Sequence, residues 1–469
     1  MILRQSPKRV CGDCLGHGVG SLESTDSRTC FTELLLQSGR NFTHDCQKQK
    51  QPSERRLLLR GIARICPHSA LQPAKDDQSS AYVRRQRASN QRQGREHCLT
   101  RLRTEFEKWI ANPLVASRPL VLFLIAAGTV FGNSTGTFPP IEDVNLPVLY
   151  GLARWDSSYY LGIATGGYAI FQHGFSFRPL FPLIMRILYP LFPFVDVKSA
   201  EVLAGFSWNF VALGGAAVYF ERSTRQLFGP GVANRALLLL AVFPSSFFFT
   251  VIYSEATYIL FISAALYYLE TRRVLVAGGL GFLAGLSRPE GFLVAIPFLV
   301  KVLFEDQKVR KLIAGLTVLA SVPAFAVYAY TQTGNILAPF QSEASASKCT
   351  ILCFFNNPVY EVATGVLPYT INLVAIVLSV IFVVRPLVRG TLSTKLFPYY
   401  LWAFVVLAVV FYSGEVLSLA RFALVVPPVF WGQAEYSSTR PRFFHGLLVG
   451  YSIMLCLATI LWVNWYPML

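Results

Sequence analysis

The stretch 153–168 places a single acidic residue among residues suited to catalysis at a membrane surface. Asp156 follows Arg154 and Trp155, two serines and two tyrosines come next, and the stretch lies just after the first long apolar segment. Because an ionisable group at that depth is costly unless it is paired or used, the pattern predicts a functional carboxylate. Such a carboxylate is able to act as a general base that takes a proton from a substrate hydroxyl group.

The same stretch also fits the start of a helix. Asp156 followed by two serines is typical of an N-cap, and the glycines at 166–167 predict the end of the helix. In this interpretation Trp155, Tyr159 and Tyr160 are anchors at the membrane interface. The two interpretations are compatible, because a cap also fixes the position of the carboxylate.

Charged residues in later segments are candidates to bind a substrate. Arg178, next to aromatic residues, is predicted either to contact a lipid phosphate or to extend to the membrane surface. Glu255 lies at a predicted outer turn. Its carboxylate is predicted either to contact the substrate or to interact favourably with the dipole at the start of a helix. Arg288 precedes Glu290 by two residues, which predicts a local ion pair or a phosphate or sugar-hydroxyl contact. Arg421 stands inside an apolar segment and needs a partner or a lipid phosphate.

Other chemical patterns are weak or absent in the sequence. It contains no Walker, Rossmann, HExxH or GxSxG motif, so nucleotide and protease chemistry are not predicted. The acidic pair at 142–143 has a proline-rich setting and is expected to be more solvated than Asp156. Cys11 and Cys14 form a lone C-x2-C pair, a weak sign of zinc, and the spacing of Cys349 and Cys353 permits a disulfide.

Composition gives the class of protein in which these residues must be positioned. Hydrophobic residues make up 53% of the chain and charged residues 14%, against about 25% charged residues in soluble domains. Apolar runs long enough for a bilayer recur from about residue 118 to the end, so we predict an all-α polytopic membrane protein. If the basic clusters face the cytoplasm, the chain crosses about eleven times, with its N-terminus inside and its C-terminus outside.

This topology predicts a large first outer loop at 133–198 that roofs a cavity. Within the loop, the apolar segment 179–195 contains four prolines and cannot cross without inverting every later loop. We therefore expect it to be re-entrant or to lie on the membrane surface. Residues 115–469 form the predicted transmembrane domain, and the apolar segment near 118–132 is expected to act as an uncleaved anchor.

The first 114 residues differ in composition from the rest. The chain has a net charge of +16, and half of its 42 lysine and arginine residues precede residue 119. This region is poor in aromatic residues, so we predict a basic, disordered extension. It is either a dispensable tail or a contact with anionic membrane lipid.

The motifs resemble a known family. Residues 154–168 followed by 177–182 resemble the first-loop signature of the phosphatidylinositol-glycan class V mannosyltransferases, the GPI mannosyltransferase 2 proteins and their bacterial and archaeal relatives. Residues 242–256 and 286–291 continue the pattern in matching order, and the resemblance covers about 115–430. Pro289 and Glu290 stand where eukaryotic members tend to have serine and asparagine, so the chain looks closer to prokaryotic members.

The resemblance implies a C-type glycosyltransferase fold and a site on the lumenal or extracytoplasmic side. The sugar donor would be a polyprenyl-phosphate carrier, Asp156 would be the acidic site residue, and transfer would invert the anomeric carbon. The acceptor would be linked to a lipid or a protein, in the plasma membrane of a prokaryote or the endoplasmic reticulum of a eukaryote.

Together these observations give the hypothesis of a hexosyltransferase, most simply a mannosyltransferase, with Asp156 as general base. The candidates to hold the leaving phosphate are Arg178, Arg288 and Arg421. The aromatic side chains of Trp155 and Tyr168 would shape the sugar site. The residues expected to contact the substrate are Arg154, Trp155, Tyr168, Arg178, Glu255, Arg288 and Arg421. No cofactor, metal ion or nucleic acid is required by this hypothesis, and partner subunits are not named by the sequence. A lipid-linked-sugar flippase or transporter is the main alternative, and a membrane scaffold is a third.

Overall fold

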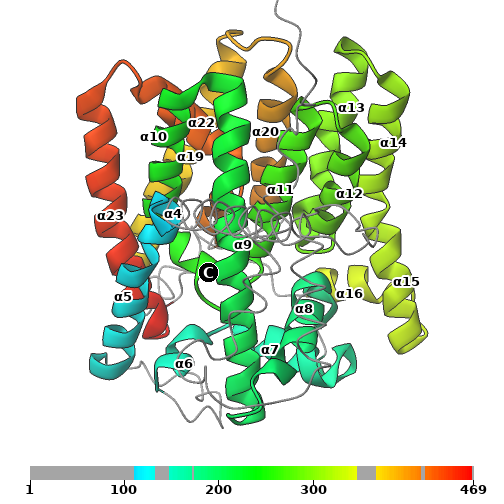
Figure 1. The fold of residues 1–469 in the computed structure, drawn as a ribbon, viewed down its shortest axis with the longest axis vertical. Coiled ribbons are helices and arrows are strands. Elements are labelled where there is room, and N and C mark those ends of the chain that lie inside the picture. Colours follow the sequence, from blue (N-terminus) through cyan, green and yellow to red (C-terminus); the bar gives the residue numbers. More distant parts are fainter. Residues whose placement is uncertain (1–109, 133–146, 172–173, 346–365, 413–417, 467–469) are drawn as a thin grey trace, which may run out of the picture. The chain divides into compact units, whose positions relative to one another are not determined.

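The computed structural model describes residues 110–132, 147–171, 174–345, 366–412 and 418–466. Every regular element in these ranges is a helix, which confirms the predicted all-α class for the part of the chain described (Figure 1). Residues Trp109–Leu469 form one compact unit, to which the following description applies. Three sets of predictions concern residues outside the described ranges: those for the extension up to residue 109, for the acidic pair 142–143 and for the four cysteines named above.

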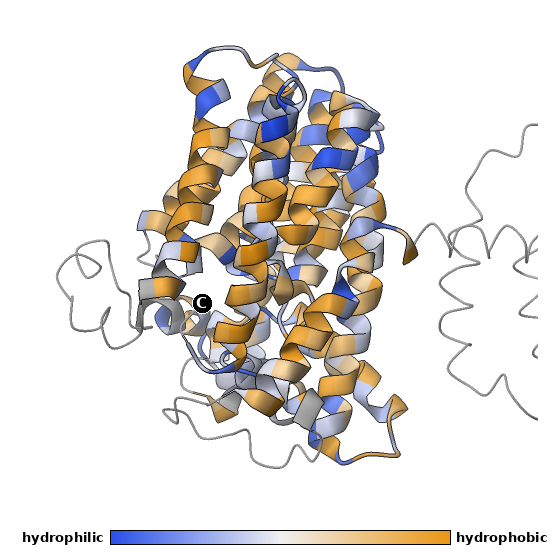
Figure 2. Cartoon of the chain, turned by 90° about the vertical axis from the view of Figure 1, so that its left-hand side faces the viewer, coloured by the Kyte–Doolittle hydropathy of each residue, from blue (hydrophilic) through white to orange (hydrophobic). Residues whose placement is uncertain are grey.

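Five helical stretches among the described residues are long and apolar enough to cross a membrane, as expected of a multi-pass membrane protein. They are Pro113–Phe131 (α4, Pro113–Ala116, with α5, Arg118–Phe131), α9 (Val197–Phe228), Lys308–Thr333 (α14, Lys308–Leu319, with α15, Ser321–Thr333), Thr370–Val388 within α19 (Val366–Val388), and α23 (Pro441–Val463). Hydrophobic residues cover most of the length of these helices (Figure 2). The predicted total of about eleven crossings stays a prediction.

Shorter apolar helices lie beside these long ones. They are α10 (Pro230–Val242), α12 (Val274–Gly285), α20 (Phe397–Tyr412) and the segment Leu180–Leu191. The helices α9, α11 (Glu255–Glu270), α12 and α14 form a row in which each contacts the next (Figure 1). Glycines allow α12 and α14 to approach closely, because a Cβ on Gly278 would stand 2.8 Å from the Ala314 backbone.

Short helices build the predicted outer loop. They are α6 (Pro147–Leu152), α7 (Ser157–Gly166), η1 (Tyr168–Ile170), η2 (Gly174–Ser176), α8 (Leu180–Leu188) and η3 (Tyr189–Leu191), with α16 (Ala338–Ser345) against η2. The proline-rich segment is thus α8 and η3, each too short to cross a bilayer. Large apolar side chains on it, including Ile187, Leu191 and Phe194, are exposed. Its place on or in the membrane stays a prediction.

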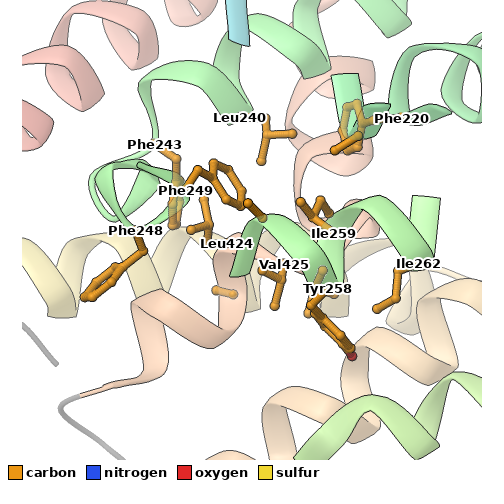
Figure 3. Close-up of a cluster of buried hydrophobic side chains, with 14 of the residues drawn as sticks. Phe220, Leu240, Phe243, Phe248, Phe249, Tyr258, Ile259, Ile262, Leu424 and Val425 are labelled. Carbon is orange, nitrogen blue, oxygen red and sulfur yellow. The ribbon is translucent and has the colours of Figure 1, made fainter. Parts of the chain in front are cut away.

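Short helical segments occupy three breaks between the longer helices. One break holds η4 (Ser246–Phe249), and another holds η5 (Pro289–Val294), which leads into α13 (Ala295–Phe304). A third precedes α22 (Pro427–Ser437) and contains the short helix α21 (Leu419–Leu424). Buried apolar side chains from η4, α11 and the end of α21 lie together there, among them Phe249, Tyr258 and Leu424 (Figure 3).

A buried arginine in α5 supports the first of these breaks. Arg118 donates hydrogen bonds from Nη1 to the carbonyl oxygen of Ser246 at 2.6 Å and from Nη2 to that of Ala241 at 2.8 Å. Backbone carbonyls that leave a helix inside an apolar protein must be satisfied by other donors. Arg118 therefore stabilises the backbone where α10 ends and η4 begins.

Candidate functional site

Asp156 occupies the start of α7, as the sequence predicts. The helix runs from Ser157 to Gly166, and Gly167 ends it in the left-handed region with φ +79°. The side chain of Asp156, however, makes no capping hydrogen bond. Its Oδ2 accepts a hydrogen bond from Nη1 of Arg421 at 3.0 Å, and 26% of the side chain is exposed. The N-cap position is confirmed, but the carboxylate is used in an ion pair.

The backbone before Asp156 is held in an unusual conformation. Trp155 has φ 55°, which costs a bulky residue about 1–3 kcal/mol and persists only where surrounding contacts enforce it. Trp155 Nε1 donates to the carbonyl oxygen of Trp462 at 3.3 Å, and the backbone N–H of Asp156 donates to Oη of Tyr253 at 3.1 Å. Burial raises the pKa of Tyr253 well above its ordinary value, so this phenol stays neutral and able to accept. These contacts fix where the carboxylate stands.

Behind Asp156, four buried charged groups continue the ion pair inward. Arg421 Nε lies 2.8 Å from Oε1 of Glu255, and the same oxygen pairs with Nη1 of Arg288. Arg288 Nε in turn pairs with Glu290. The Glu255 side chain is 0% exposed, and the side chains of Arg288 and Glu290 are almost completely buried. We call these five residues the Asp156 network.

The network draws on segments that are far apart in the sequence. Asp156 begins α7, Glu255 is the first residue of α11, and Arg421 comes from α21. Arg288 and Glu290 lie where the chain leaves α12 and enters η5, and their predicted local pair is confirmed. The helix-dipole interpretation of Glu255 also holds, since an acidic group at a helix start is favourable.

Both arginines of the network are already neutralised by carboxylates. Burial lowers the pKa of Arg421, but the carboxylates of Glu255 and Asp156 raise it further, so that it ends above its ordinary value. For Arg288, burial lowers the pKa and Glu290 and Glu255 more than compensate. The two guanidinium groups therefore stay charged and hold three carboxylates in place.

Arg154 lies close by in sequence but makes no ion pair with any other described residue. Its guanidinium carbon is 3.6 Å from the centroid of the Tyr150 ring and 5.1 Å from that of Trp465, and the residue is buried. Its Nε and Nη1 have no hydrogen-bond partner among the described residues. Trp465 has φ 66°, and its ring lies 5.4 Å from that of Trp155. Two tryptophans with left-handed backbones thus meet beside Arg154.

Tyr168 and Arg178 are placed in a second cluster rather than in the Asp156 network. Tyr168 is buried, stacks on Phe175 with centroids 4.6 Å apart, and donates from Oη to the carbonyl oxygen of Phe177 at 2.8 Å. Arg178 lies over the ring of Phe325 at 4.7 Å. These contacts hold the outer loop against α15. The structure therefore gives Tyr168 a packing contact where the sequence predicts a sugar contact.

Tyr160 also differs from its predicted place at the membrane interface. It is buried against Phe177 and Phe181, and its hydroxyl shares a hydrogen bond with Ser254 at 3.0 Å. An anchor keeps its polar tip in the headgroup region, whereas this tip faces the turn before α11. The anchor interpretation is wrong for Tyr160, because the neighbouring helices cover it.

Other contributors carry little signal in the sequence. Tyr253, Trp462 and Trp465 lie in apolar surroundings where aromatic residues are common, and only their distant contacts single them out. Within the described ranges, no group of three or more His, Cys, Asp or Glu side chains is placed to hold a metal ion. The acidic members of the Asp156 network face guanidinium groups.

Comparisons with known proteins bear on this arrangement. Residues 133–335 match the family described as Mannosyltransferase (PIG-V). GPI alpha-1,6-mannosyltransferase 2 of Cricetulus griseus is 32% identical over 206 residues, which is 39% of this chain and 41% of that protein. The Homo sapiens protein of that name is 33% identical over 158 residues, covering 33% and 32% of the two chains, respectively. The chain thus spans less than half the length of these curated relatives.

A solved structure is also similar to this chain. The Archaeoglobus fulgidus oligosaccharyltransferase, crystallised with Zn and sulfate, matches with a TM-score of 0.39 and 12% identity, covering 75% of this chain and 53% of that one.

The family match and the sequence relatives confirm the resemblance to the PIG-V mannosyltransferase family that the motifs predict. The matched residues include Asp156, Glu255, Arg288 and Glu290, whereas Arg421 lies beyond them. The relatives described above are animal proteins, and the closer likeness to prokaryotic members stays a prediction.

Proposed function

We propose that this protein is a membrane hexosyltransferase, with mannose as the sugar, and that Asp156 is its general base. The observation that carries the proposal is the position of Asp156 as the partly exposed end of an otherwise buried ion network. Confirmed resemblance to a mannosyltransferase family supports the sugar-transfer chemistry. The donor would be a polyprenyl-phosphate sugar, and the acceptor would carry its hydroxyl group on a lipid or a protein.

In the proposed step, the Asp156 carboxylate takes the proton of the acceptor hydroxyl. The acceptor oxygen forms a bond to the anomeric carbon while the bond from that carbon to the phosphate oxygen breaks, which inverts the configuration. Polyprenyl phosphate leaves with the electron pair of the broken bond. General-base assistance of this kind contributes about 10²–10⁴-fold in rate.

The leaving phosphate requires a cation that is not already committed. Arg288 and Arg421 each face two carboxylates, so they serve to hold acidic groups rather than phosphate. Arg154 is two residues from Asp156 and has two nitrogens without a hydrogen bond in the described part of the chain. We therefore assign the phosphate contact to Arg154, whose guanidinium a phosphate oxygen would reach when the Tyr150 ring moves aside.

The site is proposed to face the extracytoplasmic side. Support comes from α11, whose first residue, Glu255, belongs to the Asp156 network and whose last, Glu270, pairs with Lys301 and Lys395. Lysine-rich ends of membrane helices favour the cytoplasm. The Asp156 end would then lie in the lumen or outside the cell.

The test is transfer of labelled mannose from a defined polyprenyl-phosphate carrier by membranes that contain the full chain. Asp156→Asn is expected to lower transfer by about 10²–10⁴-fold while the protein still accumulates in membranes. Asp306→Asn, a matched change at an exposed aspartate near the lysine-rich end of α11, is expected to leave transfer unchanged.

Two outcomes would contradict the proposal. Retained transfer by Asp156→Asn would exclude the general-base role. Movement of the labelled carrier across the membrane, without any glycosylated product from the unmodified protein, would instead favour the flippase alternative.

A further inference from the structure

The Asp156 network contains one more carboxylate than it has guanidinium groups. Asp156, Glu255 and Glu290 face only Arg421 and Arg288, and each arginine is shared between two acidic groups. Uncompensated charge is expensive in a buried setting, so a proton taken from a substrate hydroxyl would relieve the surplus negative charge. Asp156 is the member that a substrate hydroxyl reaches most readily, because 26% of its side chain is exposed while Glu255 is 0% exposed.

We propose that Glu255 and Glu290 are positioning residues that act through the two arginines to make Asp156 a better proton acceptor. This inference rests on the proposed function of Asp156 and assigns a role to buried groups that touch no substrate. It replaces the expectation that Glu255 and Arg288 bind the substrate directly.

The sharing of Arg421 explains how the effect reaches Asp156. Arg421 Nη1 donates to Asp156 at 3.0 Å while its Nε lies 2.8 Å from Glu255, so Glu255 competes for the cation that would otherwise stabilise the Asp156 carboxylate. Glu290 acts one step further away, because it draws Arg288 from Glu255 and leaves Glu255 more negative toward Arg421. Both effects have the same sign.

Removing either inner carboxylate leaves the charges balanced. Without the charge of Glu255, the remaining groups are the pairs Asp156–Arg421 and Arg288–Glu290. Without that of Glu290, two arginines face Asp156 and Glu255. Neither change strands a buried guanidinium without an acidic partner, and a glutamine amide can still accept a hydrogen bond from the arginine. Both variants are therefore expected to fold.

Other titratable groups around Asp156 do not reverse this expectation. Tyr253 contacts its backbone and is kept neutral by burial, and Tyr160 is neutral for the same reason. Arg154 remains charged, but its guanidinium faces the rings of Tyr150 and Trp465. In the described part of the chain, Arg421 is the cation in contact with the Asp156 carboxylate.

The experiment is the pH dependence of mannose transfer by Glu290→Gln and Glu255→Gln in the full chain. A weaker proton acceptor loses its proton at lower pH, so the acid limb of the profile should move downward. We expect a shift on the order of one pH unit for Glu255→Gln and roughly a few tenths for Glu290→Gln. The rate on the plateau should fall about two- to tenfold, since a weaker base assists proton transfer less.

Glu305→Gln is the matched control, because Glu305 also pairs with buried cations, Lys301 and Lys311, near the other end of α11. It should leave the acid limb in place. Membrane levels and thermal stability of each variant show whether it is folded.

An acid limb that stays at the same pH in folded Glu255→Gln and Glu290→Gln overturns the inference. A uniform loss of rate at every pH indicates structural support only and overturns it as well. If Asp156→Asn loses transfer but the acid limbs of Glu255→Gln and Glu290→Gln do not move, the proposed function stands and this inference is rejected. Failure of the inference is therefore distinguishable from failure of the proposed function.

Discussion

The two ends of α11 carry the same residue in opposite settings. Glu255 at the start pairs with Arg288 and Arg421, whereas Glu270 at the end pairs with Lys301 at 2.9 Å and Lys395 at 3.1 Å. Fifteen residue steps along α11 separate the two glutamates by about 22 Å. One helix therefore links two charged clusters of different composition, one at each of its ends.

The two clusters differ in which charge is in surplus and which group is exposed. The Asp156 network has three carboxylates for two arginines, and its exposed group is a carboxylate. The Glu270 cluster has three lysines, Lys301, Lys311 and Lys395, for Glu270 and Glu305, and the Lys395 side chain is 48% exposed. An arginine fork can hold two acidic groups in fixed directions, whereas a lysine acts as a point charge. This difference is consistent with the proposed site at the Glu255 end of α11 and with the proposed cytoplasmic position of the lysine-rich Glu270 end.

The largest effect should come from Arg421→Ala. It removes the cation shared by Asp156 and Glu255 and leaves a buried carboxylate with less compensation, which costs about 3–5 kcal/mol. Thermal unfolding of the purified protein in detergent measures this loss, and transfer should be lost with it. Stability close to that of the unmodified protein would mean that Arg421 does not hold the starts of α7 and α11 together.

A smaller effect is expected from Glu270→Gln at the other end of α11. Lys301 keeps Glu305 as a partner, and the amide can still accept hydrogen bonds from Lys301 and Tyr399, so the cost should be about 1–3 kcal/mol. Transfer per folded molecule should be unchanged at every pH. A displaced acid limb in this variant would show that the two clusters are not separate in function.

The smallest effect is expected from Lys395→Ala. Its ammonium group pairs with Glu270 at the surface, and exposed ion pairs contribute about 0–1 kcal/mol. Stability should change by less than about 1 kcal/mol, and added salt should reduce even that difference. A loss as large as that of Arg421→Ala would remove the contrast between the two ends.

Local signals in the sequence predicted much of the scaffold. The glycines at 166–167 and the serines after Asp156 predicted α7, and the spacing of Arg288 and Glu290 predicted their ion pair. These features depend on neighbouring residues, so turn and capping preferences are enough to find them. The apolar runs likewise predicted an all-helical membrane protein.

Contacts between residues far apart in the sequence could not be predicted from these local signals. Arg421 was predicted to need a partner, but nothing near it names Asp156, which lies 265 residues away. The sugar contact predicted for Tyr168 rests on its aromatic character, whereas in the structure its hydroxyl donates to the carbonyl oxygen of Phe177 in the same loop. The left-handed backbones of Trp155 and Trp465 are imposed by packing, and tryptophan has no preference for that conformation.

The anchoring of α11 at both ends restricts how this helix can move. A shift by one residue along its axis, about 1.5 Å, would stretch ion pairs at Glu255 and Glu270 at the same time. A shift of α11 along its own axis is therefore unfavourable. The helix therefore gives the start of α7 a fixed support, because the backbone N–H of Asp156 donates to Oη of Tyr253, two residues before α11.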